Sequence, residues 1–129
     1  MSQQKDITTI EDIQLLVDTF YGKVRVNNLL GGIFNGVIKD RWAAHLDKMY
    51  SFWQTVLLGE HTYWGAPFPP HSQLPVNQSH FHAWLTLWHE TIDELFTGER
   101  AEEAKWRAEK MAVIFLSKIE YYQSQMQNP

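Results

Sequence analysis

The chain has 129 residues, of which 44% are hydrophobic and 20% charged, and it carries a formal net charge of −4 and no cysteine. This length suits one domain over residues 1–129, and the composition is that of a folded globular protein. The missing cysteines exclude disulfides and thiolate catalysis, and the lack of a basic stripe excludes nucleic acid as an expected partner.

No apolar run approaches the roughly 20 residues that a membrane-spanning helix needs. Residues 1–6 are mostly polar and unlike a secretory signal. We therefore expect a cytoplasmic protein that has no membrane partner.

The first predicted helix begins near Thr8, which stands three residues before Glu11 in the spacing of a capping box. Asn27 favours a stop after it. Apolar residues recur at helical spacing between these signals: Ile10, Ile13, Leu16, Val17, Phe20 and Val24. A short apolar segment over residues 31–38 begins with two glycines, which predict a turn or a brief helix.

The second long helix follows Asp40, a candidate N-cap, and ends at Gly59. Its apolar stripe comprises Trp42, His45, Met49, Phe52, Trp53 and Val56. Between His61 and Gln78 the pattern is lost, because prolines exclude a long helix there. These prolines are Pro67, Pro69, Pro70 and Pro75.

Helical spacing returns in a third long segment, which we expect to close at Gly98. Its apolar residues are Phe81, Trp84, Leu85, Trp88, Ile92 and Leu95. The last helix carries Ala104, Ala108, Met111, Phe115, Ile119 and Tyr122 on one face. No strand pattern or internal repeat accompanies them, so the predicted class is all-α, with four principal helices.

Histidines are the obvious candidates for chemistry, and composition alone does not choose among them: His45, His61, His71, His80, His82 and His89. His80 and His82 resemble a metal pair, but side chains two residues apart point to nearly opposite sides of a helix. An exposed helix start is the simpler interpretation of that pair. His61 lies just past a helix end, where a cation complements the dipole, and His89 lies on a face expected to be solvated.

His45 differs because it occupies a core-facing position on an apolar stripe. It is either a core histidine satisfied by a local hydrogen bond or a functional group. His71 lies on a loop stiffened by prolines, and from the residues alone an exposed loop histidine is the favoured interpretation. For Tyr21 and Trp84 the simplest interpretation is core packing, with the hydroxyl or indole N–H bonded to a carbonyl.

Short motifs in a fixed order carry a more specific signal. They are Phe20-Tyr21-Gly22-Lys23-Val24, Gly32-Ile33-Phe34-Asn35, Trp42-Ala43-Ala44-His45, Phe52-Trp53 followed by Leu57-Leu58-Gly59, Tyr63-x-Gly65-x-Pro67-x-x-x-His71 and Phe81-x-x-Trp84-Leu85. Each is weak alone, but the ordered set is specific. It resembles the third group of truncated haemoglobins over nearly the whole chain, from about Thr9 to Tyr122.

The resemblance implies a truncated globin fold, a sandwich of two helices over two around one haem b with its iron. The chain has no C-x-x-C-H attachment motif, so the haem would be held non-covalently. Matching motif positions imply His71 as the proximal iron ligand. The distal and wall positions fall on Tyr21, His45, Trp84, Phe20 and Phe34. Between His71 and Trp84 the chain is shorter than the family pattern, which leaves His80 and His82 as rivals of His71.

The implied function is reversible binding of oxygen, carbon monoxide or nitric oxide at a ferrous haem, as in oxygen transport. We expect a monomer, and a reductase could be its partner. Tyr21 and Trp84 are hydrogen-bond donors that suit a polarised ligand. The same pocket could instead serve a haem enzyme, either peroxidase-like or a nitric oxide dioxygenase. A third interpretation is a helical metal-binding or interaction domain without haem, which an absorption spectrum would distinguish.

Overall fold

The computed structural model describes residues 4–65, 71 and 74–127. These residues form the helices α1 (Ile10–Val26), α2 (Gly31–Ile38), α3 (Trp42–Leu58), α4 (Gln78–Leu95) and α5 (Glu99–Gln127). The described residues contain no strand beyond one isolated bridge between Lys5 and Phe96. The all-α class and the four long helices are therefore as predicted, and the glycine-led segment between the first two is the short helix α2.

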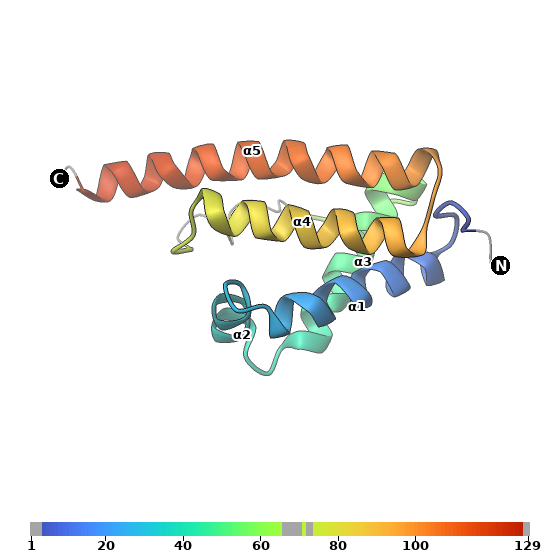
Figure 1. Cartoon of the computed structure of the whole chain (residues 1–129), viewed down its shortest axis with the longest axis horizontal. Coiled ribbons are helices and arrows are strands. Elements are labelled where there is room, and N and C mark those ends of the chain that lie inside the picture. The colour runs from blue at the N-terminus through green and yellow to red at the C-terminus, as the bar shows by residue number, and fades with distance from the viewer. Residues whose placement is uncertain (1–3, 66–70, 72–73, 128–129) are drawn as a thin grey trace.

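The helices form two crossed layers. Helices α4 and α5 lie side by side and antiparallel, and α5 extends well beyond the start of α4 (Figure 1). Helix α1 contacts α2, α3 and α4, whereas α3 contacts α1 and α5. Among the described helices, none combines the length and apolar character needed to cross a membrane.

The start of α1 is a capping box, shifted by one residue from the prediction. The Thr9 hydroxyl accepts a hydrogen bond from the Asp12 backbone N–H at 3.2 Å, and the Asp12 carboxylate accepts one from the Thr9 N–H at 3.1 Å. The predicted pair, Thr8 and Glu11, was wrong because Asp12 is the acidic residue that turns inward. The Asp12 carboxylate also pairs with the ammonium group of Lys5 at 2.6 Å.

Asp40 does not cap α3, contrary to the prediction. The cap position belongs to Arg41, whose side chain makes no bond to the start of α3. Its guanidinium instead donates to the carbonyls of Val37 at 2.6 Å and Ile38 at 3.3 Å, at the end of α2. Because the link between α2 and α3 is short, the Arg41 side chain reaches back to the last turn of α2 and satisfies carbonyls that have no partner within that helix. Gly59 ends α3 in the left-handed region, with φ 71°, as predicted.

Helix α4 ends at Leu95, and the predicted end at Gly98 was wrong. Phe96 leaves the helix because its ring is buried in the core and its neighbour Thr97 donates a backbone hydrogen bond to the Lys5 carbonyl at 3.0 Å. Gly98 is the residue immediately before α5 and does not end α4. Its φ of 136° places the Asp6 carboxylate against the first turn of α5, where it accepts from Arg100 N–H at 3.0 Å and Ala101 N–H at 2.9 Å.

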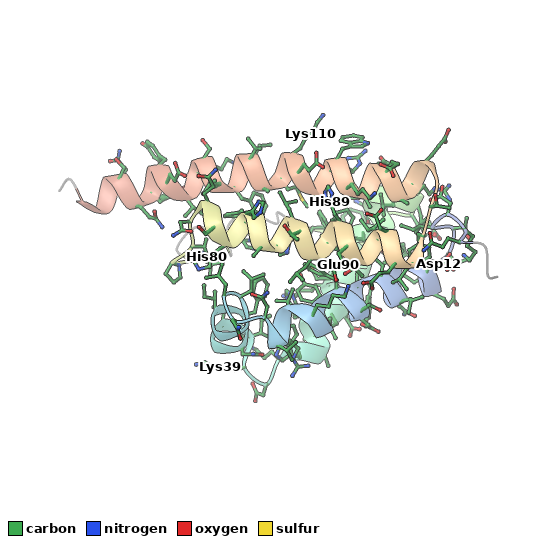
Figure 2. All side chains as sticks on the ribbon, viewed as in Figure 1. Asp12, Lys39, His80, His89, Glu90 and Lys110 are labelled. Carbon is green, nitrogen blue, oxygen red and sulfur yellow. The ribbon has the colours of Figure 1, made fainter. Side chains whose placement is uncertain are left out.

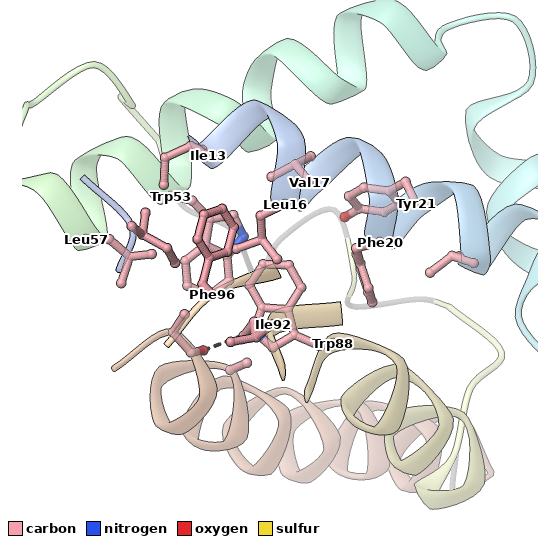
Figure 3. Close-up of a cluster of buried hydrophobic side chains, with 14 of the residues drawn as sticks. Ile13, Leu16, Val17, Phe20, Tyr21, Trp53, Leu57, Trp88, Ile92 and Phe96 are labelled. Carbon is pink, nitrogen blue, oxygen red and sulfur yellow. Dashed lines mark hydrogen bonds between the residues drawn. The ribbon is translucent and has the colours of Figure 1, made fainter. Parts of the chain in front are cut away.

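The core lies where α1, α3, α4 and α5 meet. Trp88 and Ile92 of α4 pack against the apolar face of α1 (Figure 3). Small buried residues on α5 let α4 approach closely, and the Trp88 indole N–H donates to the Ala104 carbonyl at 3.0 Å. The core is therefore dense at this end of the molecule, and the remaining space lies toward the other end of α4.

Candidate functional site

A cavity lies between the helix layers, with about 1000 Å³ of space that no atom fills, part of it open to solvent. Its walls come from every helix and from the segment before α4. They include the six residues singled out in the sequence: Phe20, Tyr21, Phe34, His45, His71 and Trp84. Most other lining residues are aromatic or aliphatic. They are Leu30, Ile33, Met49, Phe52, Trp53, Leu74, Val76, Phe81, Trp88, Met111, Ala112 and Phe115, with His80 as a third histidine.

Tyr21 stands at the end of the core that faces this cavity. It is buried, and its ring meets that of Phe20 edge-on at 4.9 Å and that of Phe34 at 6.0 Å. Its hydroxyl makes no hydrogen bond within the described residues, so the predicted bond from this hydroxyl to a carbonyl is absent among them. Burial raises the pKa of this phenol well above its usual value, so it remains a protonated donor.

His45 lines the cavity from α3, with its ring edge-on to that of Tyr21 at 5.1 Å. Its Nε2 atom is buried and has no hydrogen-bond partner among the described residues. The interpretation as a core histidine satisfied locally is therefore wrong. Burial lowers the pKa of His45 to about 4, helped by the nearby charges of His71 and Lys48, so the imidazole is neutral at neutral pH.

His71 is half-buried and borders the cavity rather than lying on an exposed loop. Its ring rests against that of Phe115 on α5, with centroids 5.1 Å apart and planes 42° apart. Its carbonyl accepts a hydrogen bond from the Leu74 N–H at 3.2 Å. The prolines expected to stiffen this loop before His71 lie outside the described residues.

His80 and His82 diverge, as their spacing requires. His82 is exposed, whereas His80 is half-buried and borders the cavity from the first turn of α4 (Figure 2). The His80 Nδ1 accepts from the Asn77 backbone N–H at 3.0 Å, completing the capping box of α4. The prediction of an exposed helix start therefore holds for His82 and fails for His80. The Asn77-x-x-His80 spacing was the signal that could have separated them.

The remaining histidines lie away from the cavity lining. His61 is exposed and its ring lies against that of Trp64, with centroids 4.0 Å apart. His89 is half-buried between α4 and α5 rather than solvated, and its Nε2 lies 3.1 Å from the Glu109 carboxylate (Figure 2).

Three tryptophans form a stack along one wall of the cavity. Trp84 and Trp88 are one turn apart on α4, with centroids 6.3 Å apart and planes within 3° of parallel. Trp53 of α3 also stacks on Trp88, with centroids 4.7 Å apart and planes 26° apart. Their helical spacing predicted a buried face but not a cavity, because the same pattern suits packing against another helix.

Known proteins are similar to this chain in both sequence and architecture. The family model of the bacterial-like globins matches residues 5–116. A group 3 truncated haemoglobin of Campylobacter jejuni is 35% identical over 116 residues, which cover 87% of this chain and 91% of that protein. The crystal structure of the group III truncated haemoglobin from Campylobacter jejuni matches with a TM-score of 0.82 and 33% identity, covering 91% of this chain and 95% of that one. With its helices in this arrangement around an aromatic cavity, the chain belongs to the bacterial-like globin family, in the third group of truncated haemoglobins.

Proposed function

We propose that this chain holds one haem b non-covalently in the cavity, with His71 as the proximal ligand to the iron. The ferrous haem would bind oxygen reversibly, and other diatomic ligands such as carbon monoxide and nitric oxide. Tyr21, His45 and Trp84 would contact the ligand, and Phe20 and Phe34 would wall the pocket. Membership of the globin family supports the haem, and the cavity lining supports the choice of residues.

The observation that carries the proposal is the unpartnered Nε2 of His45. A buried polar atom without a hydrogen bond costs on the order of 1–3 kcal/mol, so natural sequences rarely keep one without a purpose. His45 lines a cavity whose other walls are mostly apolar and aromatic, as the faces of a porphyrin require. The residues present therefore fit a haem that brings a polar ligand into the same space.

Each polar side chain has a defined task in this proposal. A haem held here would supply an iron that can take up a diatomic gas. His71 would supply an imidazole nitrogen, and its ring lies against that of Phe115. The Tyr21 hydroxyl and the Trp84 indole N–H donate hydrogen bonds to a polarised ligand. His45, neutral because its pKa is lowered to about 4, can donate or accept there without bringing a buried charge.

Absorption spectra of the purified protein test the haem directly. We expect an intense Soret band in the ferric and ferrous forms and a shift of that band with carbon monoxide. His71→Ala should abolish or severely weaken haem retention. His82→Ala is the matched control, because His82 lies on the exposed side of α4 and should retain the haem fully.

His80→Ala decides between the two histidines that border the cavity. Normal haem content in this variant supports His71 as the ligand. If His71→Ala keeps normal haem content and His80→Ala loses it, the ligand assignment is wrong. A colourless protein that does not take up added haem would overturn the proposal as a whole.

A further inference from the structure

The three-tryptophan stack has a use that ligand binding does not require. The rings of Trp84 and Trp88 are nearly parallel, and the ring of Trp53 also stacks on that of Trp88. Apolar packing is satisfied equally well by edge-to-face rings, which is how Phe20 meets both Trp84 and Trp88. Near-parallel rings at these separations bring the indoles close enough for an electron to pass from one to the next. The stack thus runs along the cavity wall from α4 to α3.

The middle ring of the stack is suited to passing an electron on rather than to remaining oxidised. Trp88 is only 1% exposed, and its N–H is bonded to the Ala104 carbonyl, marked by the dashed line in Figure 3. A backbone carbonyl accepts a hydrogen bond but does not take up the proton. An oxidised Trp88 would therefore stay a cation, buried where a charge is unfavourable, until a neighbour supplies an electron.

Beyond the stack, aromatic rings continue toward the surface. Phe52 meets Trp53 edge-on at 5.2 Å, and Tyr63 meets Phe52 edge-on at 5.3 Å. Tyr63 is half-buried in the segment after α3. Its hydroxyl can lose a proton to water when the ring loses an electron, which fixes the radical there. Tyr21 also lines the cavity but is a poor alternative, because its hydroxyl makes no hydrogen bond among the described residues and burial raises its pKa.

We propose that Trp84, Trp88 and Trp53 form a relay that carries an oxidising equivalent from the haem cavity to Tyr63. The relay rests on the proposed haem. Hydrogen peroxide would be the oxidant: two electrons from the haem would cleave its O–O bond, releasing one water and leaving the second oxygen, as oxide, with the haem. Trp84 returns one electron to the haem, and Trp88, Trp53 and finally Tyr63 each refill the one before. Tyr63 loses its hydroxyl proton to solvent and becomes a neutral radical, while the second oxidising equivalent stays at the haem.

The relay is tested on the ferric holoprotein mixed with equimolar hydrogen peroxide. Freeze-quench electron paramagnetic resonance detects the radicals, and a spin trap followed by peptide mass spectrometry locates the adduct. We expect a tyrosyl radical and an adduct on Tyr63. In Trp88→Phe both should fall to background, because the central indole is gone. Trp106→Phe is the matched control, since Trp106 is 42% exposed and stacks on none of the relay rings.

Tyr63→Phe keeps the test valid if the buried Trp88→Phe variant folds poorly, because it removes only a hydroxyl from a half-buried ring. It should abolish the tyrosyl signal and prolong the tryptophan signal. An adduct on Tyr21 or Trp106, or an unchanged Tyr63 adduct in folded Trp88→Phe, would overturn the relay. Haem content is measured first in every variant. A protein that holds haem but forms no Tyr63 radical overturns the relay alone, whereas one that holds no haem overturns both proposals.

Discussion

The ring of His45 stands edge-on against the ring of Tyr21, with the centroids 5.1 Å apart and the planes at 86°. Trp42 meets both rings, at 5.8 Å from each. The phenol and the imidazole therefore share one patch of cavity wall, and a change in either ring alters the surroundings of the other. Effects of substitutions at these positions are expected to be coupled.

Tyr21→Phe should accelerate oxygen dissociation. The substitution keeps the ring in the core and removes only the hydroxyl, so it leaves little cavity. A lost hydrogen bond of about 1.4 kcal/mol corresponds to a roughly tenfold faster release. Stopped-flow release of oxygen measures the rate. Carbon monoxide is less polar, so its release should change less and serves as the internal control.

Trp84→Phe should also accelerate oxygen dissociation, although it changes volume as well as removing the indole N–H. Because Tyr21 and Trp84 would share one acceptor, the double variant should show less than the sum of the two single effects. The same stopped-flow measurement on the two single variants and the double variant gives the coupling. Unchanged oxygen release in both single variants would mean that another group, such as His45, holds the ligand.

His45 should border the ligand without binding the iron permanently. The ferric protein should therefore give a spectrum that is not low-spin with two histidine ligands, and His45→Leu should leave the haem content unchanged. Leucine fills a similar volume and removes the unpartnered Nε2. A low-spin, six-coordinate ferric spectrum that reverts in His45→Leu would show that His45 is a second axial ligand.

Asp12 should stabilise the fold in a pH-dependent way. Burial of its carboxylate acts to raise the pKa, but hydrogen bonds from Lys5 and from the Thr8 and Thr9 backbone outweigh it and lower the pKa from 3.8 to about 2. The contribution, about 2 kcal/mol, is present above pH 4 and is lost as the pH falls through 2. Urea unfolding of wild type and Asp12→Asn should differ at neutral pH and converge near pH 2. Glu11→Gln, exposed on the same turn, should show a much smaller difference.

Gly98→Ala should destabilise the protein by about 1–3 kcal/mol. An added Cβ would stand 2.5 Å from the Asp6 carboxyl carbon, and φ at this position is 136°. Asp6 is held by backbone N–H groups at the start of α5, so it yields only by giving up these bonds. Gly36→Ala is the opposite control: its added Cβ meets nothing within 4 Å in helix α2, so it should stabilise slightly. Thermal or urea unfolding measures both, and equal effects would contradict the role of Gly98.

The helices were predictable because their apolar spacing is dense, and the family motifs named six residues that border the same cavity. Helix ends were less predictable where tertiary contacts decide them. Phe96 ends α4 because its side chain enters the core, and Arg41 serves the end of α2 instead of the start of α3. A glycine such as Gly98 typically ends a helix. Here its positive φ and its lack of a Cβ instead leave room for the carboxylate of Asp6.

The cavity itself was the hardest feature to foresee from residue spacing. Trp88 and Trp53 sit on apolar stripes that suit a solid core just as well as a cavity wall. His80 was misplaced because an i, i+2 pair of histidines separates the two rings but does not say which of them faces inward. That choice depends on how α4 packs against its neighbours, which is a tertiary property.

The carboxylate that receives the first amides of α5 comes from Asp6, and 94 residues separate Asp6 from Arg100. On a ribosome Asp6 is made 94 residues before Arg100, so this contact has to wait until the start of α5 has been made. Closing so long a loop carries an entropic cost that local helix formation does not. The contact is therefore expected to form late in folding, and pulsed hydrogen exchange during refolding should show when the Ala101 amide becomes protected by Asp6.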